Sequence, residues 1–215
     1  MGNGDFDQQS YWIKRHKRLR GDPRSVGNLG KSLEENLHAE KNIKQWMGCA
    51  ANLLRPCSSV LDIGCGYGRV AAAFCDAGYD YTGVDVSSEA VAAARRNEPR
   101  GTYIEGSALE VDFGRKFDLV CVLYVFVHFV DDQKWRQLIA KLTGSLEIGG
   151  GLLFADVFPE ERTQSVPHAV ARPLSMYDEI FEASGMKRDP AFRDRLAEAL
   201  DRPKIPSVHL ARRLE

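Results

Sequence analysis

The chain has 215 residues, of which 44% are hydrophobic and 27% are charged, and its formal net charge is −1. This composition is typical of a soluble globular domain, and the near-neutral charge argues against a protein built mainly to bind nucleic acid. No apolar run approaches the roughly 18 residues that a transmembrane helix needs, and the first residues lack the apolar core of a secretory signal. We therefore expect a cytoplasmic protein with no membrane partner.

The cysteines agree with that expectation. There are five, and no two of them form a CxxC pair. An odd number without close pairs does not suggest a disulfide framework, so free thiols in a reducing compartment are expected.

The first 31 residues differ from the rest of the chain. They are polar and basic and contain several glycines, which predicts an arm or lid, 1–31, on a single domain that spans 32–215. Ser32 and Glu35 have the spacing of a capping box, so a helix is expected to begin there and to run to about Leu54. Pro56 then ends it.

From residue 58 onward, strand patterns alternate with helix patterns. Strands are expected over residues 59–64, 80–86, 102–106, 117–126 and 149–158, and helices over 69–78, 87–97 and 131–146. Ser87 or Ser88 is the expected N-cap of the second of these helices. This alternation predicts an α/β fold with a mostly parallel sheet and helices on both faces.

The last third of the chain is less regular. Residues 158–174 contain three prolines and are expected to form a long irregular loop, which in a compact domain is usually functional. A helix over 175–185 with Ser175 as its cap should follow, then a strand near Met186–Arg188, a helix over 191–201 and a last strand over 207–214.

The stretch "LDIGCGYGR", residues 61–69, has glycines at positions 64, 66 and 68, where the first expected strand turns into a helix. Residues without side chains let the backbone approach a ligand, and the start of a helix offers unbonded N–H groups. Asp85 ends the second expected strand, 21 residues after Gly64. An acid at that place can accept hydrogen bonds from a ribose diol.

The pattern differs from that of dinucleotide-binding proteins. Their G-x-G-x-x-G motif would require a glycine at position 69, which is Arg69 here. Asp62 also precedes the turn, where its negative charge would oppose a pyrophosphate. S-adenosylmethionine has a sulfonium and an ammonium group and no phosphate, so it suits this site better.

Several segments together resemble the class I S-adenosylmethionine-dependent methyltransferases of the small-molecule type. They are "VLDIGCGYG", "GVDVS", "GSALEVDF", "FDLVCVLYVFVHF" and "LEIGGGLLFAD", and the resemblance covers about residues 58–190. It implies a Rossmann-like, seven-stranded, mostly parallel sheet with one antiparallel strand, the last, inserted between the fifth and the sixth. It also implies S-adenosyl-L-homocysteine as the product.

The resemblance assigns cofactor contacts to motif positions along the chain. The residues expected beside the methionine part are Asp62, Gly64, Cys65 and Gly66, the glycines and Cys65 through their backbone. The residues expected beside the ribose and adenine are Asp85, Val86, Ser107 and Ala108. Leu123 and Tyr124 are expected beside the sulfonium. Ser107 stands where the family often has an aspartate. In the arm, Tyr11 and Trp12 are expected to close over the cofactor or acceptor, the alternative being simple packing of the arm.

Three side chains are candidates for catalysis. His128 follows the fourth expected strand, His168 lies in the proline-bearing loop, and Asp156 ends the fifth strand. Either histidine could be the general base that a hydroxyl acceptor needs, and Asp156 could orient the acceptor. The alternative is that His128 is only packed near the site and that His168 is exposed to solvent.

Two other kinds of chemistry are less well supported. The adjacent Asp131 and Asp132 suit a helix N-cap better than a metal site, so no metal is expected. Cys65 has no base partner in the sequence, and a backbone role fits it better than that of a nucleophile.

These observations predict methyl transfer to a hydroxyl, or second to an amine, of a small, anionic or sugar-like metabolite. The basic residues of the arm suit an anionic acceptor, although they could also form a solvated face. The alternatives are a methyltransferase of RNA or protein and a non-catalytic binder of S-adenosylmethionine. Methyltransferases that act on nucleic acid or on glutamine have an Asn/Asp-Pro-Pro-Tyr motif after the fourth strand. This chain has "LYVF" there, which argues against a methyltransferase of RNA or protein. A monomer or homodimer is expected.

Overall fold

The structure is a computed structural model that describes residues 6–20, 22–202 and 207–214. It divides into two compact units, which we describe separately. The N-terminal unit holds residues 9–108, and the C-terminal unit holds residues 109–214 with the short segment 6–8.

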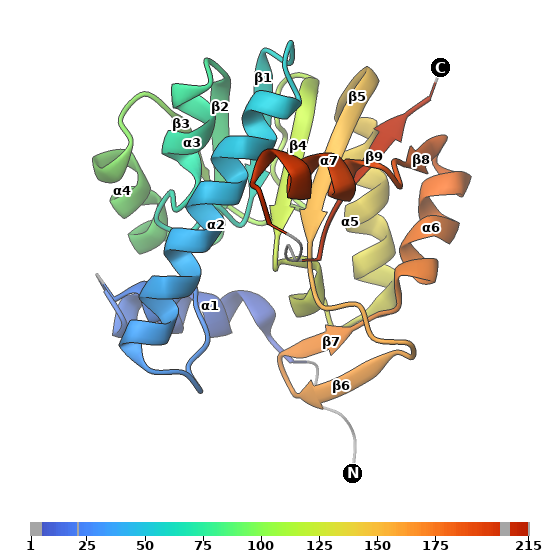
Figure 1. The fold of residues 1–215 in the computed structure, drawn as a ribbon. Coiled ribbons are helices and arrows are strands. Elements are labelled where there is room, and N and C mark those ends of the chain that lie inside the picture. Colours follow the sequence, from blue (N-terminus) through green and yellow to red (C-terminus); the bar gives the residue numbers. More distant parts are fainter. Residues whose placement is uncertain (1–5, 21, 203–206, 215) are drawn as a thin grey trace. The chain divides into compact units, whose positions relative to one another are not determined.

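The N-terminal unit is a parallel three-stranded sheet with helices, and its strand order is β3-β2-β1. In chain order its elements are α1 (Gln8–Arg18), the 3₁₀ turn η1 (Pro23–Ser25), α2 (Leu33–Leu53), β1 (Ser59–Ile63), α3 (Ala71–Asp76), β2 (Asp80–Asp85), α4 (Ser88–Asn97) and β3 (Thr102–Glu105). Figure 1 shows these elements in blue and green. Every residue of β1 is buried, as is expected for a strand covered on both faces.

The predicted helix starts in this unit are confirmed. Ser32 accepts a hydrogen bond from the Glu35 N–H, and the Glu35 side chain accepts one from the Ser32 N–H, so the capping box of α2 is complete. Ser87 caps α4 through the Ala90 N–H. Each cap satisfies N–H groups that have no partner within the helix, which is why these local sequences begin helices where they do.

The segment predicted as an arm contains a helix that the sequence did not predict. Helix α1 is polar and basic, yet Arg15 and His16 on it are buried. Burial of such residues depends on contacts with other elements, and hydrophobic periodicity does not show them.

The C-terminal unit contains the other four strands of the main sheet, in the order β4-β5-β9-β8. Its elements are β4 (Phe117–Leu123), the 3₁₀ turn η2 (Phe126–His128), α5 (Asp132–Gly144), β5 (Leu146–Ala155), β6 (Thr163–Val166), β7 (Ala169–Ala171), α6 (Leu174–Ala183), β8 (Met186–Arg188), α7 (Phe192–Ala199) and β9 (Val208–Arg213). Strand β4 is parallel to β5, whereas β9 is antiparallel to both β5 and β8. The seven strands are thus those of the predicted Rossmann-like fold, with the last strand antiparallel between the fifth and sixth, as expected.

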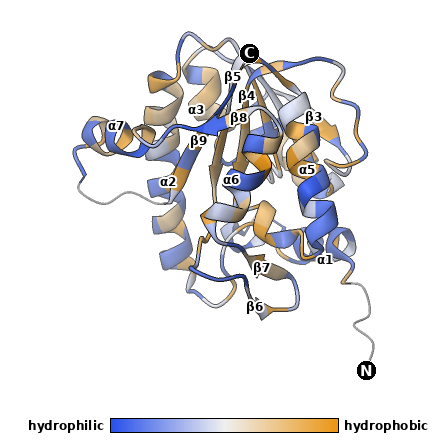
Figure 2. Ribbon diagram, turned by 90° about the vertical axis from the view of Figure 1, so that its right-hand side faces the viewer, coloured by the Kyte–Doolittle hydropathy of each residue, from blue (hydrophilic) through white to orange (hydrophobic). Residues whose placement is uncertain are grey.

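An aromatic core fills one side of the C-terminal unit. Trp135 on α5, Phe154 on β5 and Tyr177 on α6 are each no more than 1% exposed, and their rings pack edge to face or stacked at 4.9 and 5.6 Å. Helices α5 and α6 lie on one face of these strands and α7 on the other (Figures 1 and 2). Hydrophilic and hydrophobic residues alternate along α5 and α6 in Figure 2, as is typical of helices with one buried face.

Several predictions for this unit were wrong in detail, among them the fifth strand, which spans Leu146–Ala155 instead of 149–158. The loop 158–174 is not irregular throughout, because β6 and β7 pair as an antiparallel hairpin within it. The fourth strand ends at Leu123, and residues 126–128 form a 3₁₀ turn instead. Helix α6 begins after Pro173 and has no side-chain cap, so Ser175 is not its N-cap. The N-cap expected for α5 is confirmed at Asp131, which accepts a hydrogen bond from the Lys134 N–H at 2.8 Å.

Candidate active site

The glycine turn follows β1 in the N-terminal unit. Gly64, Gly66 and Gly68 all have positive φ angles, of 69°, 55° and 78°. A side chain would be strained in this left-handed conformation, so glycine is needed at these turns. At Gly66 there is also no space, because a Cβ atom would lie 2.7 Å from a methyl carbon of Val26.

Hydrogen bonds fix this turn to the end of β2. The N–H groups of Gly64 and Cys65 both donate to the Val84 carbonyl, at 2.8 and 3.1 Å. The N–H of Gly66 donates to the Asp85 carboxylate at 2.9 Å. The turn therefore uses its own backbone to hold the acid that the sequence predicts as the ribose ligand.

Asp85 is buried, with 7% of its surface exposed, and has a second backbone donor in the Ser87 N–H at 3.0 Å. Burial raises the pKa of this carboxyl group, while the nearby His16 and the backbone donors act in the opposite direction. Two N–H groups stabilise the charged form and fix the orientation of both oxygens. Each carboxylate oxygen can accept more than one hydrogen bond, so acceptor capacity remains for a ligand.

The residues predicted for the adenine side are in the same unit. Ser107 and Ala108 are each 8% exposed and follow β3, and the Gly106 N–H donates to the Asp85 carbonyl at 2.9 Å. Val86 is half-buried and directly follows Asp85. The structure therefore brings these four predicted residues to the carboxyl ends of β2 and β3, the edge where open α/β sheets bind ligands.

Two residues beside the turn have protein partners. Asp62 is 2% exposed and accepts a hydrogen bond from the Tyr81 hydroxyl at 2.6 Å. The Cys65 thiol is buried, and burial together with Asp85 and Asp62 raises its pKa well above the usual value. A thiol held in this neutral form is a poor nucleophile. A backbone contact of Cys65 with a cofactor stays a prediction. A contact of Asp62 with the methionine part of a cofactor stays a prediction.

The aromatic residues predicted in the arm lie on α1. Trp12 packs edge to face against Tyr11 at 5.4 Å, and the Arg15 guanidinium lies over the Trp12 ring at 4.8 Å. Sequence reasoning missed that His16, one turn after Trp12, lies close to Asp85: its Nδ1 is 3.8 Å from Asp85 Oδ1. The spacing of four residues places Trp12 and His16 on one helix face but gives no sign of the contact with Asp85.

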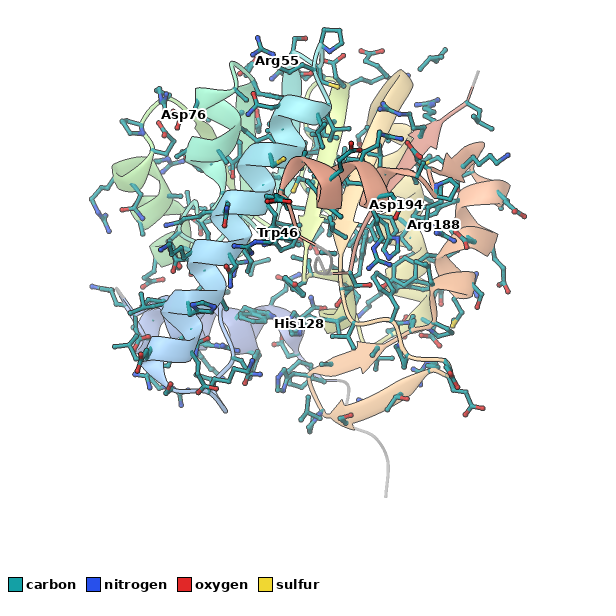
Figure 3. All side chains as sticks on the ribbon, viewed as in Figure 1. Trp46, Arg55, Asp76, His128, Arg188 and Asp194 are labelled. Atoms are coloured by element: carbon teal, nitrogen blue, oxygen red, sulfur yellow. The ribbon has the colours of Figure 1, made fainter. Side chains whose placement is uncertain are left out.

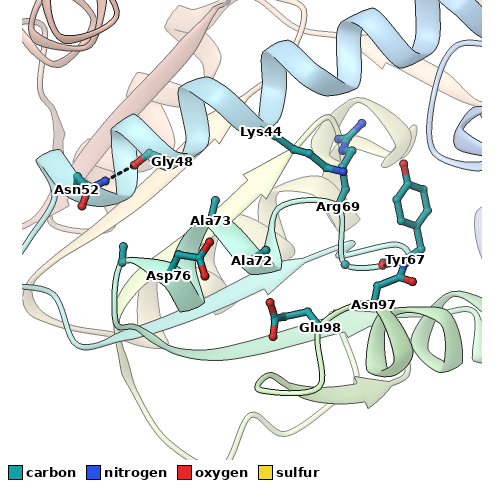
Figure 4. A pocket seen from close by; sticks show the side chains of 12 residues that line it. Lys44, Gly48, Asn52, Tyr67, Arg69, Ala72, Ala73, Asp76, Asn97 and Glu98 are labelled. Carbon is teal, nitrogen blue, oxygen red and sulfur yellow. Dashed lines mark hydrogen bonds between the residues drawn. The ribbon is translucent and has the colours of Figure 1, made fainter.

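A separate pocket of about 630 Å³ also lies in the N-terminal unit (Figure 4). Its lining residues come from α2, the glycine turn, α3 and the end of α4, and include Lys44, Arg69 and Asp76. Neither Asp85 nor Ser107 lines it. Because this pocket does not reach the predicted ribose and adenine residues, we do not take it as the cofactor site.

In the C-terminal unit, the end of β4 has an unusual backbone. Leu123 is buried, and the next residue, Tyr124, has a φ angle of 59°. Its N–H donates to the Ala155 carbonyl at 2.8 Å, which extends the pairing with β5 by one bond. A left-handed conformation at a bulky residue is costly and persists only where surrounding contacts require it, often at functional sites.

The two candidate histidines lie together in the same unit (Figure 3 labels His128). Their rings stack with centroids 5.9 Å apart, and His128 Nδ1 is 2.9 Å from the His168 carbonyl oxygen. A carbonyl can only accept, so in the neutral ring the proton is on Nδ1 and the lone pair is on Nε2. This is the tautomer that a general base would use.

Asp156 supports the turn that carries His128. It is 3% exposed and accepts hydrogen bonds from the Val127 N–H at 2.8 Å and from its neighbour Val157 at 3.0 Å. Burial raises the pKa of its carboxyl group to about 7. Its contacts explain how it orients residues 126–128, which is a different task from the predicted contact with the acceptor.

The acids at the start of α5 are both engaged by the protein. Asp131 caps the helix, and Asp132 pairs with Arg172 at 2.6 Å and with Arg162 at 3.1 Å. Within the described part of the chain, no three side chains of histidine, cysteine, aspartate or glutamate gather as metal ligands would. The same residues contain no helix that is long and apolar enough to cross a membrane.

Comparison with known proteins agrees with the fold and with the resemblance. Residues 60–150 match the family model of a methyltransferase domain. Two solved structures have the same Rossmann-like class I fold over most of their length. The sugar N-methyltransferase KedS8 from Streptoalloteichus sp is 17% identical, with a TM-score of 0.66 and coverage of 87% of this chain and 95% of that one. Magnesium protoporphyrin IX methyltransferase from Synechocystis is also 17% identical, with a TM-score of 0.68 and coverage of 99% and 100%.

Curated relatives match over shorter stretches. An uncharacterized methyltransferase of Synechocystis sp. is 28% identical over 130 residues, which are 60% of this chain and 58% of that protein. The chain spans about half the length of the curated relatives it matches. The chain thus has the Rossmann-like fold of these two solved structures, and its residues 60–150 match the model of a methyltransferase domain.

Proposed function

We propose that this protein transfers a methyl group from S-adenosyl-L-methionine to a small molecule and releases S-adenosyl-L-homocysteine. The observation that carries the proposal is the buried Asp85 carboxylate, fixed by the N–H groups of Gly66 and Ser87 at the end of β2. An oriented, desolvated carboxylate is well suited to accept hydrogen bonds from both hydroxyls of a ribose. The domain match over residues 60–150 and the fold neighbours support the same function.

The choice of S-adenosylmethionine over a dinucleotide cofactor depends on two residues. Arg69 stands where a dinucleotide-binding turn has its third glycine, and the buried Asp62 precedes the turn. The loop N–H groups of Gly64 and Cys65 donate to the Val84 carbonyl and do not form an open phosphate cradle. A cofactor without phosphates fits both features.

When bound, the cofactor supplies an electrophilic methyl group, so the protein has to position an acceptor and, for a hydroxyl, remove its proton. His128 is the proposed base, because the His168 carbonyl holds its Nδ1 proton and leaves the lone pair on Nε2. Asp156 fixes the turn that carries His128 through the Val127 N–H. Most of the rate gain in such a displacement comes from positioning.

We infer a small acceptor with a hydroxyl as the first choice for the acceptor atom and an amine as the second. The base-competent tautomer of His128 favours the hydroxyl, because a neutral amine needs less help. Two fold neighbours, a sugar N-methyltransferase and magnesium protoporphyrin IX methyltransferase, support a small acceptor. The basic residues on α1 suit an anionic or sugar-like acceptor.

Binding of the demethylated cofactor, measured by calorimetry, tests the site. Asp85→Ala should weaken the binding of S-adenosyl-L-homocysteine by about 2–3 kcal/mol, because charge-assisted hydrogen bonds are lost. Asp80→Ala, at the exposed opposite end of β2, is the matched control and should bind as the parent does. Equal binding by the Asp85 variant and the parent would remove the ribose assignment.

Turnover needs a second assay, in which a panel of hydroxylated and amino metabolites is incubated with methyl-labelled cofactor. Labelled product with a small acceptor is the expected result. Labelling of RNA or protein only would favour the macromolecular alternative. Tight cofactor binding without transfer to any acceptor class would mean that the protein is a non-catalytic binder.

A further inference from the structure

His16 is a buried polar side chain whose ring packs against that of Trp12, with centroids 5.8 Å apart. It is 5% exposed on α1, and among the described residues neither of its ring nitrogens has a hydrogen-bond partner. A buried imidazole that makes no hydrogen bond loses its hydration without compensation. Such a group is worth explaining, because buried polar atoms in proteins usually have a partner.

The neighbours of His16 indicate where the partner belongs. Its Nδ1 lies 3.8 Å from Asp85 Oδ1, too far for a hydrogen bond between the two. One hydroxyl oxygen at about 2.8 Å from each atom would bridge them, since two such bonds easily span that separation. Asp85 is already held by the N–H groups of Gly66 and Ser87, so the protein fixes the orientation of the carboxylate that faces His16.

Helix α1 is held in place by its own contacts within the N-terminal unit. The guanidinium of Arg15, next to His16, donates to the carbonyl of Arg24 at 2.7 Å and also to that of Gly27. Val26, between these two anchors, packs directly over Gly66 of the glycine turn. Helix α1 therefore approaches Asp85 through His16, and Val26 covers Gly66 of the glycine turn.

We propose that His16 is a cofactor-binding residue that hydrogen-bonds the ribose hydroxyl held on its other side by Asp85. This inference rests on the function proposed above, and it extends the predicted cofactor residues to a side chain on the arm.

The charge state of the site is compatible with this contact. Burial lowers the pKa of His16, and Arg15 acts in the same direction, whereas Asp85 and the more distant Glu89 oppose it. A neutral imidazole has one N–H donor and one acceptor nitrogen, and either can bond a hydroxyl.

The test is calorimetry of S-adenosyl-L-homocysteine binding to His16→Ala and His16→Phe, with thermal unfolding of each variant as the check on folding. Both should bind about three- to tenfold more weakly than the parent, as expected for loss of one hydrogen bond. His38→Ala removes an exposed histidine from α2 and should leave binding unchanged. Phenylalanine keeps a ring without nitrogens, so it separates hydrogen bonding from packing.

A second probe ties the effect to the ribose. The parent should bind the 2′-deoxy and the 3′-deoxy analogues more weakly than S-adenosyl-L-homocysteine. For the analogue that lacks the hydroxyl bonded by His16, this loss of affinity should be smaller in His16→Phe than in the parent. If His16→Phe binds S-adenosyl-L-homocysteine as tightly as the parent, the role of His16 is wrong. Tighter binding by the variant would also overturn it, because His16 would then occupy the place of the ribose. Neither result would affect the proposed function. Failure of the folded parent to bind S-adenosyl-L-homocysteine at all would overturn the proposed function with it.

Discussion

Asp156 is a side chain of the C-terminal unit whose protonation is changed by its buried environment. Its carboxyl group is buried and has a pKa of about 7, raised by burial from a reference value of 3.8. The folded protein therefore holds a proton there between about pH 4 and pH 7, where the unfolded chain has released it. Through this group the free energy of unfolding is highest below that range and falls as the pH rises through it.

Asp156→Asn removes this dependence. For the parent, the contribution of Asp156 should fall by up to about 1.4 kcal/mol per pH unit between pH 4 and 7, and the variant should lack it. Denaturant unfolding at several pH values measures the difference between the two proteins. A difference that is the same at pH 4 and pH 7 would contradict the raised pKa.

His209 is the matched control, because its pKa is shifted in the opposite sense. Burial lowers the pKa of this histidine to about 4. A histidine with a depressed folded pKa contributes stability that is lost as the pH falls from about 6.5 towards 4. The contribution of His209 to the free energy of unfolding therefore rises with pH, whereas that of Asp156 falls. His209→Gln should remove the first of these slopes and Asp156→Asn the second, so the two variants separate contributions that nearly cancel in the parent.

At the level of elements, one buried arginine connects the β6–β7 hairpin to the start of α5. Arg172, at the end of β7, is fully buried, lies over the Trp135 ring at 4.5 Å and donates to the Phe129 carbonyl at 2.8 Å. It also pairs with Asp132 at 2.6 Å. Arg162, which directly precedes β6, pairs with the same carboxylate, but its side chain is 40% exposed.

The two arginines should therefore differ sharply in their effect on stability. Arg172→Lys loses the fork of donors that bonds two partners at once and should destabilise the protein by about 3 kcal/mol. Arg162→Lys should change the free energy of unfolding by less than about 0.5 kcal/mol, as is usual for exposed ion pairs. Chemical denaturation measures both, and equal effects of the two substitutions would refute the role of Arg172.

The elements that the sequence predicted well are those with local signals. Capping residues such as Ser32 and Asp131, and strand runs such as 117–123, determine their structure through nearby residues. The hairpin was missed because every residue of β6 is exposed, which leaves no alternation to detect. The contact of His16 with Asp85 was missed because it joins residues 69 positions apart on different elements, which no local pattern records.

At the scale of the whole molecule, a ligand that binds only the folded chain should raise its melting temperature. S-adenosyl-L-homocysteine at about 100 times its dissociation constant should add about 2.7 kcal/mol, or about 5–10 °C for a protein of this size. NAD at the same concentration should give no shift, because Arg69 replaces the glycine that a dinucleotide needs. Differential scanning calorimetry measures both, and a larger shift with NAD would contradict the choice of cofactor.

The position of β9 has a consequence for how the chain acquires its structure. Strand β9 is the last of the described strands, yet it lies between β5 and β8, and β8 pairs with no other described strand of the sheet. During synthesis β8 leaves the ribosome before β9 and has nothing to pair with until β9 follows. The edge of the sheet can therefore close only after translation has passed residue 213, and until then β5 exposes an unpaired edge that chaperones or other nascent chains can bind.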